Sequence, residues 1–157
     1  MEADALFDEA LRLYQERELE DAGSTFGSAQ LLYEEIGYET RITECVSWIG
    51  ECQRLVNMRE EALSLLSEGQ NTLEEGSSAV SAAGYEKAKS LFEQARSKWE
   101  EYGDDVKASE CDEKISECEK GISVVNRNRI VLGCVCVAIV LAGVVMVLKR
   151  RRKPQPG

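Results

Sequence analysis

The sequence predicts an all-α protein in which a domain of stacked helical hairpins is joined to one C-terminal transmembrane helix. Three observations lead to this prediction. Both prolines lie at positions 154 and 156, so helix is permitted throughout the preceding chain. Apolar residues recur at steps of three and four over most of the first 122 positions, whereas no stretch alternates at the period of two that is typical of strands. Nineteen consecutive uncharged residues then run from Ile130 to Leu148.

We expect about six helices in the domain, at approximately residues 3–17, 20–36, 40–57, 59–75, 78–102 and 104–122. Each is defined by a one-sided apolar stripe. In chain order the stripes are Ala3, Leu6, Ala10, Leu13; Ala22, Phe26, Ala29, Tyr33; Ile42, Cys45, Ile49, Cys52; Ala62, Leu66, Gly69, Leu73; Ala88, Phe92, Ala95, Trp99; and Ala108, Cys111, Ile115, Cys118. Gly37, Gly76 and Gly103 are expected to end the second, fourth and fifth helices. Asp104 is expected to cap the sixth.

The segment 130–148 has the length of a membrane span. At a rise of about 1.5 Å per residue it covers roughly 28 Å, close to the roughly 30 Å hydrocarbon thickness of a bilayer. Basic residues follow at once: Lys149, Arg150, Arg151, Arg152 and Lys153. We therefore expect a helical domain (1–122), a juxtamembrane linker (123–129), the transmembrane helix (130–148) and a short basic tail (149–157).

Charge separates these regions and limits the function classes. All 29 acidic residues but only 14 of the 19 basic residues precede Ile130. Such an acidic domain is unsuited to binding nucleic acid, because neutralising phosphates requires clustered Lys and Arg. The same charge favours protein partners that carry a basic patch.

The orientation in the membrane is predicted by two rules that disagree. The first fifteen residues mix acidic and apolar side chains and do not resemble a secretory signal. This favours a tail-anchored protein whose domain is cytosolic. The positive-inside rule instead favours a cytosolic location for the basic tail. We expect a cytosolic domain, because exporting a folded acidic domain needs a dedicated signal, but the conflict stays open.

An internal repeat is the most informative feature of the domain. Aligning residues 22–53 with 88–119, an offset of 66, gives twelve identities in 32 positions. The repeated unit is a helix, a glycine-containing turn and a second helix. A one-sided apolar stripe cannot be buried within one such unit, so neighbouring units must stack.

The repeated helix carries a small-large-small pattern: Ala22, Phe26, Ala29 and Ala88, Phe92, Ala95, with Ala62, Leu66, Gly69 as a weaker copy. This pattern resembles the second-helix signature of tetratricopeptide repeats. The repeat spacing is irregular and the proline that usually closes each repeat is missing, so the resemblance is to a degenerate, longer-helix form. It implies stacked hairpins over residues 3–122 and a concave surface that binds another protein. Candidate residues for that groove are Arg12, Tyr14, Ser47 and Trp48. Trp48 lies off the main apolar stripe and suits either a core or a contact position.

Four cysteines form two pairs spaced by seven residues: Cys45 with Cys52, and Cys111 with Cys118. Within a pair the sulfurs lie about 10.5 Å apart along a helix, too far for a disulfide. The spacing also differs from that of common zinc sites, and the chain has no His. We expect these residues to be small buried hydrophobes, with a membrane-bound metal or redox module as the alternative.

The residue types give little support for catalysis. Without His, the usual Ser–His or Cys–His nucleophile is excluded, and no glycine-rich phosphate loop follows a strand. We expect no enzyme activity, no cofactor and no small-molecule substrate. The leading prediction is a membrane-tethered adaptor that binds another protein, and an organelle-shaping or recruitment factor is a further alternative.

Overall fold

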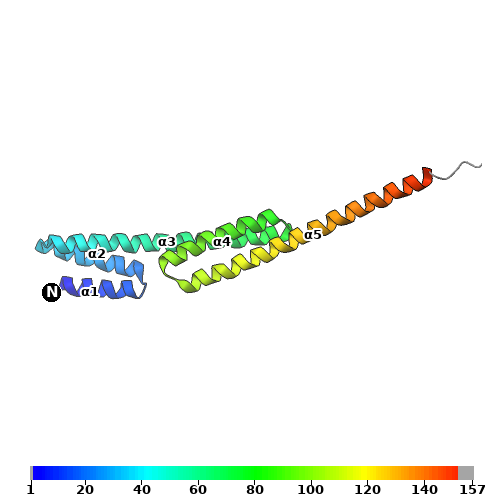
Figure 1. Ribbon diagram of the computed structural model, residues 1–157. Coiled ribbons are helices and arrows are strands. Elements are labelled where there is room, and N and C mark those ends of the chain that lie inside the picture. The colour runs from blue at the N-terminus through cyan, green and yellow to red at the C-terminus, as the bar shows by residue number, and fades with distance from the viewer. Residues whose placement is uncertain (1, 152–157) are drawn as a thin grey trace, which may run out of the picture.

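The computed structural model describes residues 2–151, with side chains as far as residue 145. That part of the chain forms helices and no strand, which confirms the all-α prediction. The helices are α1 (Glu2–Gln15), α2 (Leu19–Ile36), α3 (Glu39–Ser78), α4 (Ala82–Tyr102) and α5 (Asp105–Arg151). Figure 1 shows an elongated molecule in which α3 runs along the whole domain and α5 projects beyond it.

The predicted number of helices is wrong, because two sets of expected segments are continuous. The expected helices 40–57 and 59–75 form the single helix α3. No Gly or Pro lies between positions 51 and 68, and Leu55, Met58 and Ala62 stay buried across the expected break. In the same way, α5 contains the expected sixth helix, the linker 123–129 and the apolar segment. Of the basic tail, residues 149–151 belong to α5, while Arg152 and Lys153 lie outside the described residues.

The turns after α2 and α4 have the same geometry. Gly37 has φ 69° and Gly103 has φ 86°, both in the left-handed region that lacks a penalty only for glycine. At each turn the residue after the glycine donates its amide hydrogen to the carbonyl oxygen five positions back, at 2.9 Å. These predicted helix ends are therefore confirmed. Asp104 caps α5, since its Oδ1 accepts the amide hydrogen of Lys107 at 2.9 Å.

The domain consists of two three-helix units that share α3. The N-terminal unit (residues 2–54) contains α1, α2 and the first half of α3. The C-terminal unit (residues 60–125) contains the second half of α3, α4 and the first part of α5. In each unit the middle helix packs antiparallel between the outer two. Residues at the offset of 66 are buried alike, at most 2% exposed: Ala22 and Ala88, Phe26 and Phe92, Ala29 and Ala95, Cys45 and Cys111, Cys52 and Cys118.

The same offset also relates α1 to the second half of α3, which the sequence comparison missed. The buried residues are Ala3, Phe7 and Ala10 in α1, and Gly69, Leu73 and Gly76 in α3. The sequence predicted that Gly76 would end a helix, and this prediction is wrong. Gly76 lies inside α3, where it allows the backbone of α4 to come close.

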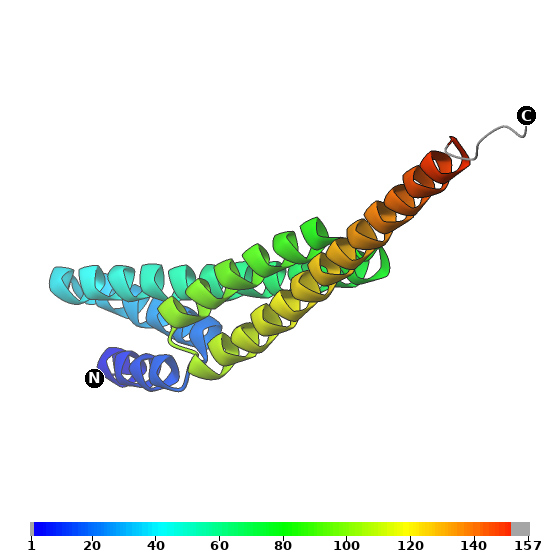
Figure 2. The ribbon, with the colours of Figure 1, turned by 45° about the vertical axis from the view of Figure 1, so that its right-hand side comes forward.

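The two units meet where the α1–α2 turn reaches the α4–α5 turn, close to the middle of α3 (Figure 2). The guanidinium carbon of Arg17 lies 4.9 Å from the centre of the Tyr102 ring. Leu19, at the start of α2, is fully buried in a core cluster with Trp99 and Tyr102. Arg59 of α3 adds an ion pair to Glu20 of α2. The contacts with Tyr102 and Trp99 hold the α1–α2 turn and the start of α2 against the end of α4, and the ion pair holds α2 against α3.

Beyond Val125, the last buried side chain described in α5, the helix leaves the domain. The large apolar side chains from Ile130 to Val145 are about half exposed or more. Among the described residues, α5 is the one helix long and apolar enough to cross a membrane, and none of its most apolar window is buried in the domain. The span predicted from the sequence therefore coincides with an uncovered helix.

Candidate partner-binding groove

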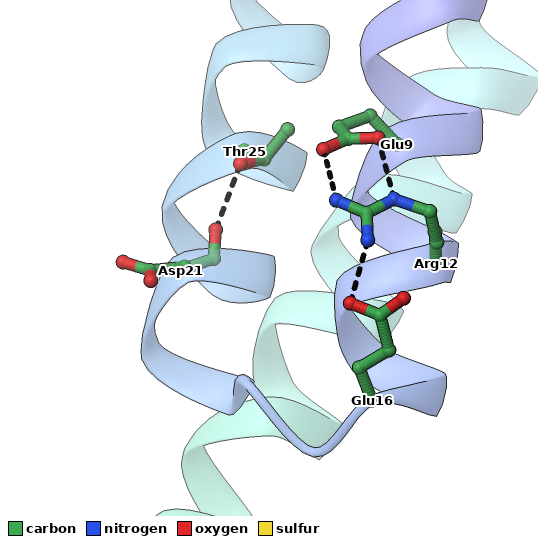
Figure 3. A network of polar contacts seen from close by, with 5 residues as sticks. All are labelled: Glu9, Arg12, Glu16, Asp21 and Thr25. Atoms are coloured by element: carbon green, nitrogen blue, oxygen red, sulfur yellow. Dashed lines mark hydrogen bonds and ion pairs between the residues drawn. The ribbon is translucent and has the colours of Figure 1, made fainter.

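The four residues predicted to line a groove lie in the N-terminal unit, but they do not share one open surface. Arg12 is exposed on α1, where its guanidinium group pairs with Glu9 at 2.6 Å and with Glu16 at 2.5 Å (Figure 3). The hydrogen bonds that Arg12 donates to Glu9 and Glu16 raise the pKa of Arg12. Ser47 is exposed on α3.

Tyr14 and Trp48 instead belong to the packed interior between α1 and α3. Their rings meet edge to face with centroids 5.0 Å apart. The Trp48 ring also stacks on Phe26 of α2, with centroids 5.7 Å apart and planes 7° from parallel. Both side chains are half-buried against the N-terminal core. Trp48 therefore fills the space between the outer helices of its unit.

The C-terminal unit has an open groove in the corresponding place, between α3 and α5. Two adjoining hollows form it, with volumes of about 440 Å³ and 640 Å³, and Gln70 lines both. The smaller hollow lies over Phe92 of α4, and the larger one lies over Leu73 and Tyr85. We call this combined surface the α3–α5 groove. Its lining residues at the far end include Val124 and Val125, next to the apolar part of α5.

The groove is open because α3 and α5 are held apart by α4. Few residues of α3 and α5 come close together, whereas both helices pack along α4. Close contacts of glycines with neighbouring helices set this arrangement. A Cβ atom on Gly121 of α5 would lie 2.4 Å from the Tyr85 ring, and one on Gly69 of α3 would lie 2.8 Å from the Phe92 ring. The aromatic rings of α4 thus form the floor, and α3 and α5 form the walls.

The rim of the groove is mainly acidic. Its charged residues are Glu74 on α3, and Glu110, Glu113, Lys114, Glu117 and Lys120 on α5. Lys114 is already paired with Glu117 at 3.0 Å, and Gln70 donates a hydrogen bond to Glu74 at 2.9 Å. Glu110 is likewise paired with Lys107 at 2.7 Å, so two of the four lining carboxylates are already neutralised by lysines.

The four repeated cysteines are buried free thiols, as the sequence predicted. They are distributed over three core clusters: Cys45 and Cys52 in one, Cys111 in a second and Cys118 in a third. Burial raises the pKa of all four thiols, which disfavours the thiolate form that binds metals and attacks disulfides. Within residues 2–145, no three His, Cys, Asp or Glu side chains are grouped so as to hold a metal ion.

The sequence placed its groove candidates in the N-terminal unit, whereas the open groove between outer helices lies in the C-terminal unit. The signal that could have found it is the pair Trp48 and Lys114, which align at the offset of 66. A tryptophan fills the space over Phe26, whereas its counterpart, a lysine, borders the hollow over Phe92. Comparisons of this chain with protein-family models, with curated proteins and with solved structures found no match.

Proposed function

We propose that this protein is a membrane-tethered adaptor that holds a protein partner in the α3–α5 groove, beside the membrane surface. The observation that carries this proposal is the continuity of α5. One unbroken helix forms a wall of the groove, from Glu110 to Val125, and then the apolar segment that begins at Ile130. Val125 precedes Ile130 by five residues, or about 7.5 Å of helix. A partner in the groove would thus lie immediately above the lipid headgroups.

The continuous helix also bears on how a partner would be presented. A flexible linker would let the domain rotate freely relative to the membrane. A helical connection keeps the direction of the groove fixed relative to the span, and Arg127 and Arg129 suit the headgroup region. The resemblance to tetratricopeptide repeats supports the same reading, because stacked helical hairpins offer extended surfaces to other proteins. We place the domain on the cytosolic side.

Membrane attachment is tested by comparing the full chain with a chain truncated after Asn126. The full chain should remain in the membrane pellet after alkaline carbonate extraction, and the truncated chain should be found in the supernatant. Protease added to sealed vesicles that display the cytosolic face should digest the domain. Persistence of the truncated chain in the pellet would contradict the role of α5, and a protected domain would reverse the orientation.

The adaptor role is tested by photo-crosslinking in native membranes. A photoreactive residue at Gln70 lies inside the groove, whereas one at Leu31, which is 62% exposed on α2, serves as the matched control outside it. A discrete protein adduct should form from position 70 and be absent from position 31. Equal adducts from both positions, or none from either, would argue against a partner site in the groove.

A further inference from the structure

We infer that the α3–α4 turn (residues 79–81) contacts the lipid surface, with the Val80 side chain inserted among the headgroups, as a second membrane contact beside the α5 span. This inference rests on the membrane attachment in the proposed function and does not depend on a partner in the groove. It is carried by the position of the turn, by its composition, and by the exposure and backbone conformation of Val80.

The α3–α4 turn lies at the end of the domain from which α5 projects (Figure 1, Figure 2). Val80 lines the same hollow as Val124 and Val125 of α5, so the turn lies close to the last residues that α5 packs on the domain. Val124 precedes Ile130 by six residues, or about 9 Å of helix. The headgroup layer extends about 5–8 Å outside the hydrocarbon on each side. A tilt of α5 toward the turn by about 20°, the average for transmembrane helices, would bring the turn into that layer.

The turn is uncharged in an otherwise highly charged domain. No residue from Gly76 to Tyr85 carries a charge, and the nearest acidic residues, Glu75 and Glu86, lie five and six positions from Val80. Each of the other three turns between the described helices has an acidic residue in it or directly after it: Glu16 and Glu18, Glu39, and Asp104. Because removing a charge from water is costly, the α3–α4 turn is the one best suited to enter a headgroup layer.

The equivalent turn of the N-terminal unit shows the contrast. At the offset of 66, two acidic residues and an arginine align with small uncharged residues: Glu16, Arg17 and Glu18 with Ala82, Ala83 and Gly84. The charged turn lies near the middle of α3, where Arg17 contacts the Tyr102 ring. The two units therefore differ in charge at the turn that lies nearest to the membrane in one of them and against protein in the other.

Val80 is both exposed and conformationally unusual. Its side chain is 60% exposed, and its φ of 50° lies in the left-handed region, which β-branched residues rarely adopt. Backbone strain of this kind persists where the residue has a function. An apolar side chain held out from the domain gains free energy when lipid replaces the water around it.

The charges of α5 near the turn suit phospholipid headgroups. No acidic residue follows Glu119 in the sequence, and the charged residues between it and the apolar segment are Lys120, Arg127 and Arg129. Lys120 lines the same hollow as Val80. Basic side chains at this level attract headgroup phosphates, whereas the acidic remainder of the domain does not. The end of the domain that carries the turn is therefore the end that a lipid surface accepts.

The test places a fluorophore in the turn of the full chain, reconstituted in phosphatidylcholine vesicles. Cys134→Ala and Cys136→Ala remove the exposed cysteines, and the other four are buried in the core. In this background Val80→Cys is labelled with a nitrobenzoxadiazole in detergent before reconstitution. Phosphatidylcholine that carries a nitroxide on its headgroup should then quench at least half of the emission.

Val106→Cys is the matched control, because Val106 is also an exposed valine, at 70%. It lies at the start of α5, 24 residues or about 36 Å of helix before Ile130. A fluorophore there should keep nearly all of its emission. Quenching at position 80 no greater than at position 106 would overturn the inference.

A substitution at the contact itself separates insertion of Val80 from mere proximity. The fluorophore is moved to Ala83→Cys, which is exposed beside the turn. Val80→Asp should abolish quenching at position 83, and Val106→Asp should leave it unchanged. Asp adopts positive φ more readily than Val, so the fold should be retained, as circular dichroism checks. Quenching at position 83 that persists in Val80→Asp would show that Val80 does not make the contact.

A fluorophore at Val137→Cys, inside the apolar segment, reports separately on the span. If lipid with a nitroxide on its acyl chain quenches position 137 while position 80 stays unquenched by the headgroup label, α5 anchors the protein and the turn contact is refuted. If position 137 is also unquenched, α5 is not inserted, and the proposed membrane attachment fails together with this inference.

Discussion

Gly76 of α3 and Gly84 of α4 face each other so closely that a Cβ atom on Gly84 would lie 2.6 Å from the Cα atom of Gly76. The contact is between backbones, so no flexible side chain can move aside. It lies near the α3–α4 turn, where both glycines line a hollow of about 370 Å³ that is separate from the α3–α5 groove. The distance between α3 and α4 therefore depends on the absence of a side chain at both positions.

Gly84→Ala should accordingly destabilise the domain. Overpacking of this kind costs roughly 1–3 kcal/mol, which exceeds the gain of up to about 1 kcal/mol in helix propensity when Gly is replaced by Ala. The free energy of unfolding is measured by urea denaturation in mild detergent, followed by circular dichroism. Gly50→Ala is the matched control, because a Cβ atom there meets nothing within 4 Å. It should be neutral or stabilising, and equal behaviour of the two variants would contradict the close contact.

Trp48→Ala should strongly destabilise the N-terminal unit. The change removes the stacking on Phe26 and the edge contact with Tyr14, and large-to-small substitutions at aromatic core positions cost about 3–5 kcal/mol when fully buried. Because Trp48 is only half-buried, we expect about 2–4 kcal/mol. Lys114→Ala, at the equivalent position of the C-terminal unit, should change stability by less than about 1 kcal/mol, since its ion pair with Glu117 is exposed. Similar losses in both variants would show that the two units are filled alike.

The contact between Tyr33 and Asp4 should make stability depend on pH at both extremes. The Tyr33 hydroxyl donates a hydrogen bond to Asp4 Oδ1 at 2.8 Å. Burial, with a contribution from Asp4, raises the pKa of Tyr33 to about 12. Because the unfolded value is about 10, the stability from the neutral phenol is complete below pH 10 and lost as the pH rises through 12.

On the acid side, the Tyr33 hydrogen bond lowers the pKa of Asp4. Its contribution is therefore present above the unfolded pKa of about 3.9 and is lost as the pH falls through the lower folded value. Thermal melts of the wild type and of Tyr33→Phe, recorded across the pH range, check both effects. The substitution should flatten the alkaline slope between pH 10 and 12. An unchanged alkaline slope in Tyr33→Phe would assign that dependence to other groups.

The features that depend on the residue pattern within one helix or turn could be predicted from the sequence. Helical periodicity, the left-handed turns at Gly37 and Gly103, the Asp104 cap and the burial of the repeated cysteines are all present in the structure. Each of these follows from residues within one helix or turn. The helix break near residue 58 was wrong, because no breaking residue lies there and the buried stripe through Met58 continues.

The location of the groove could not be predicted in the same way. It depends on three helices that are distant in the sequence and on how closely glycines let them approach. Gly69 was correctly assigned to a buried stripe, but its close approach to the Phe92 ring was not predicted. Gly76 was expected to end a helix, but it lies inside α3 where that helix contacts α4. The tryptophan at position 48 was equally consistent with a core and with a contact surface until its stacking on Phe26 was known. Tertiary contacts, rather than periodicity, decided these positions.

Cysteine accessibility distinguishes a membrane-inserted α5 from one exposed to water. The chain has six cysteines: four are buried in the domain, whereas Cys134 and Cys136 are exposed on the apolar part of α5. In liposomes a membrane-impermeant maleimide should label none of them rapidly, because the core protects four and lipid protects the other two. Denaturation in dodecyl sulfate should make all six reactive, as counted by mass spectrometry.

Leu31→Cys, on the exposed face of α2, is the positive control and should add one rapidly labelled site. Rapid labelling of Cys134 and Cys136 in intact liposomes would show that the apolar half of α5 lies outside the bilayer, and the adaptor would then have no anchor.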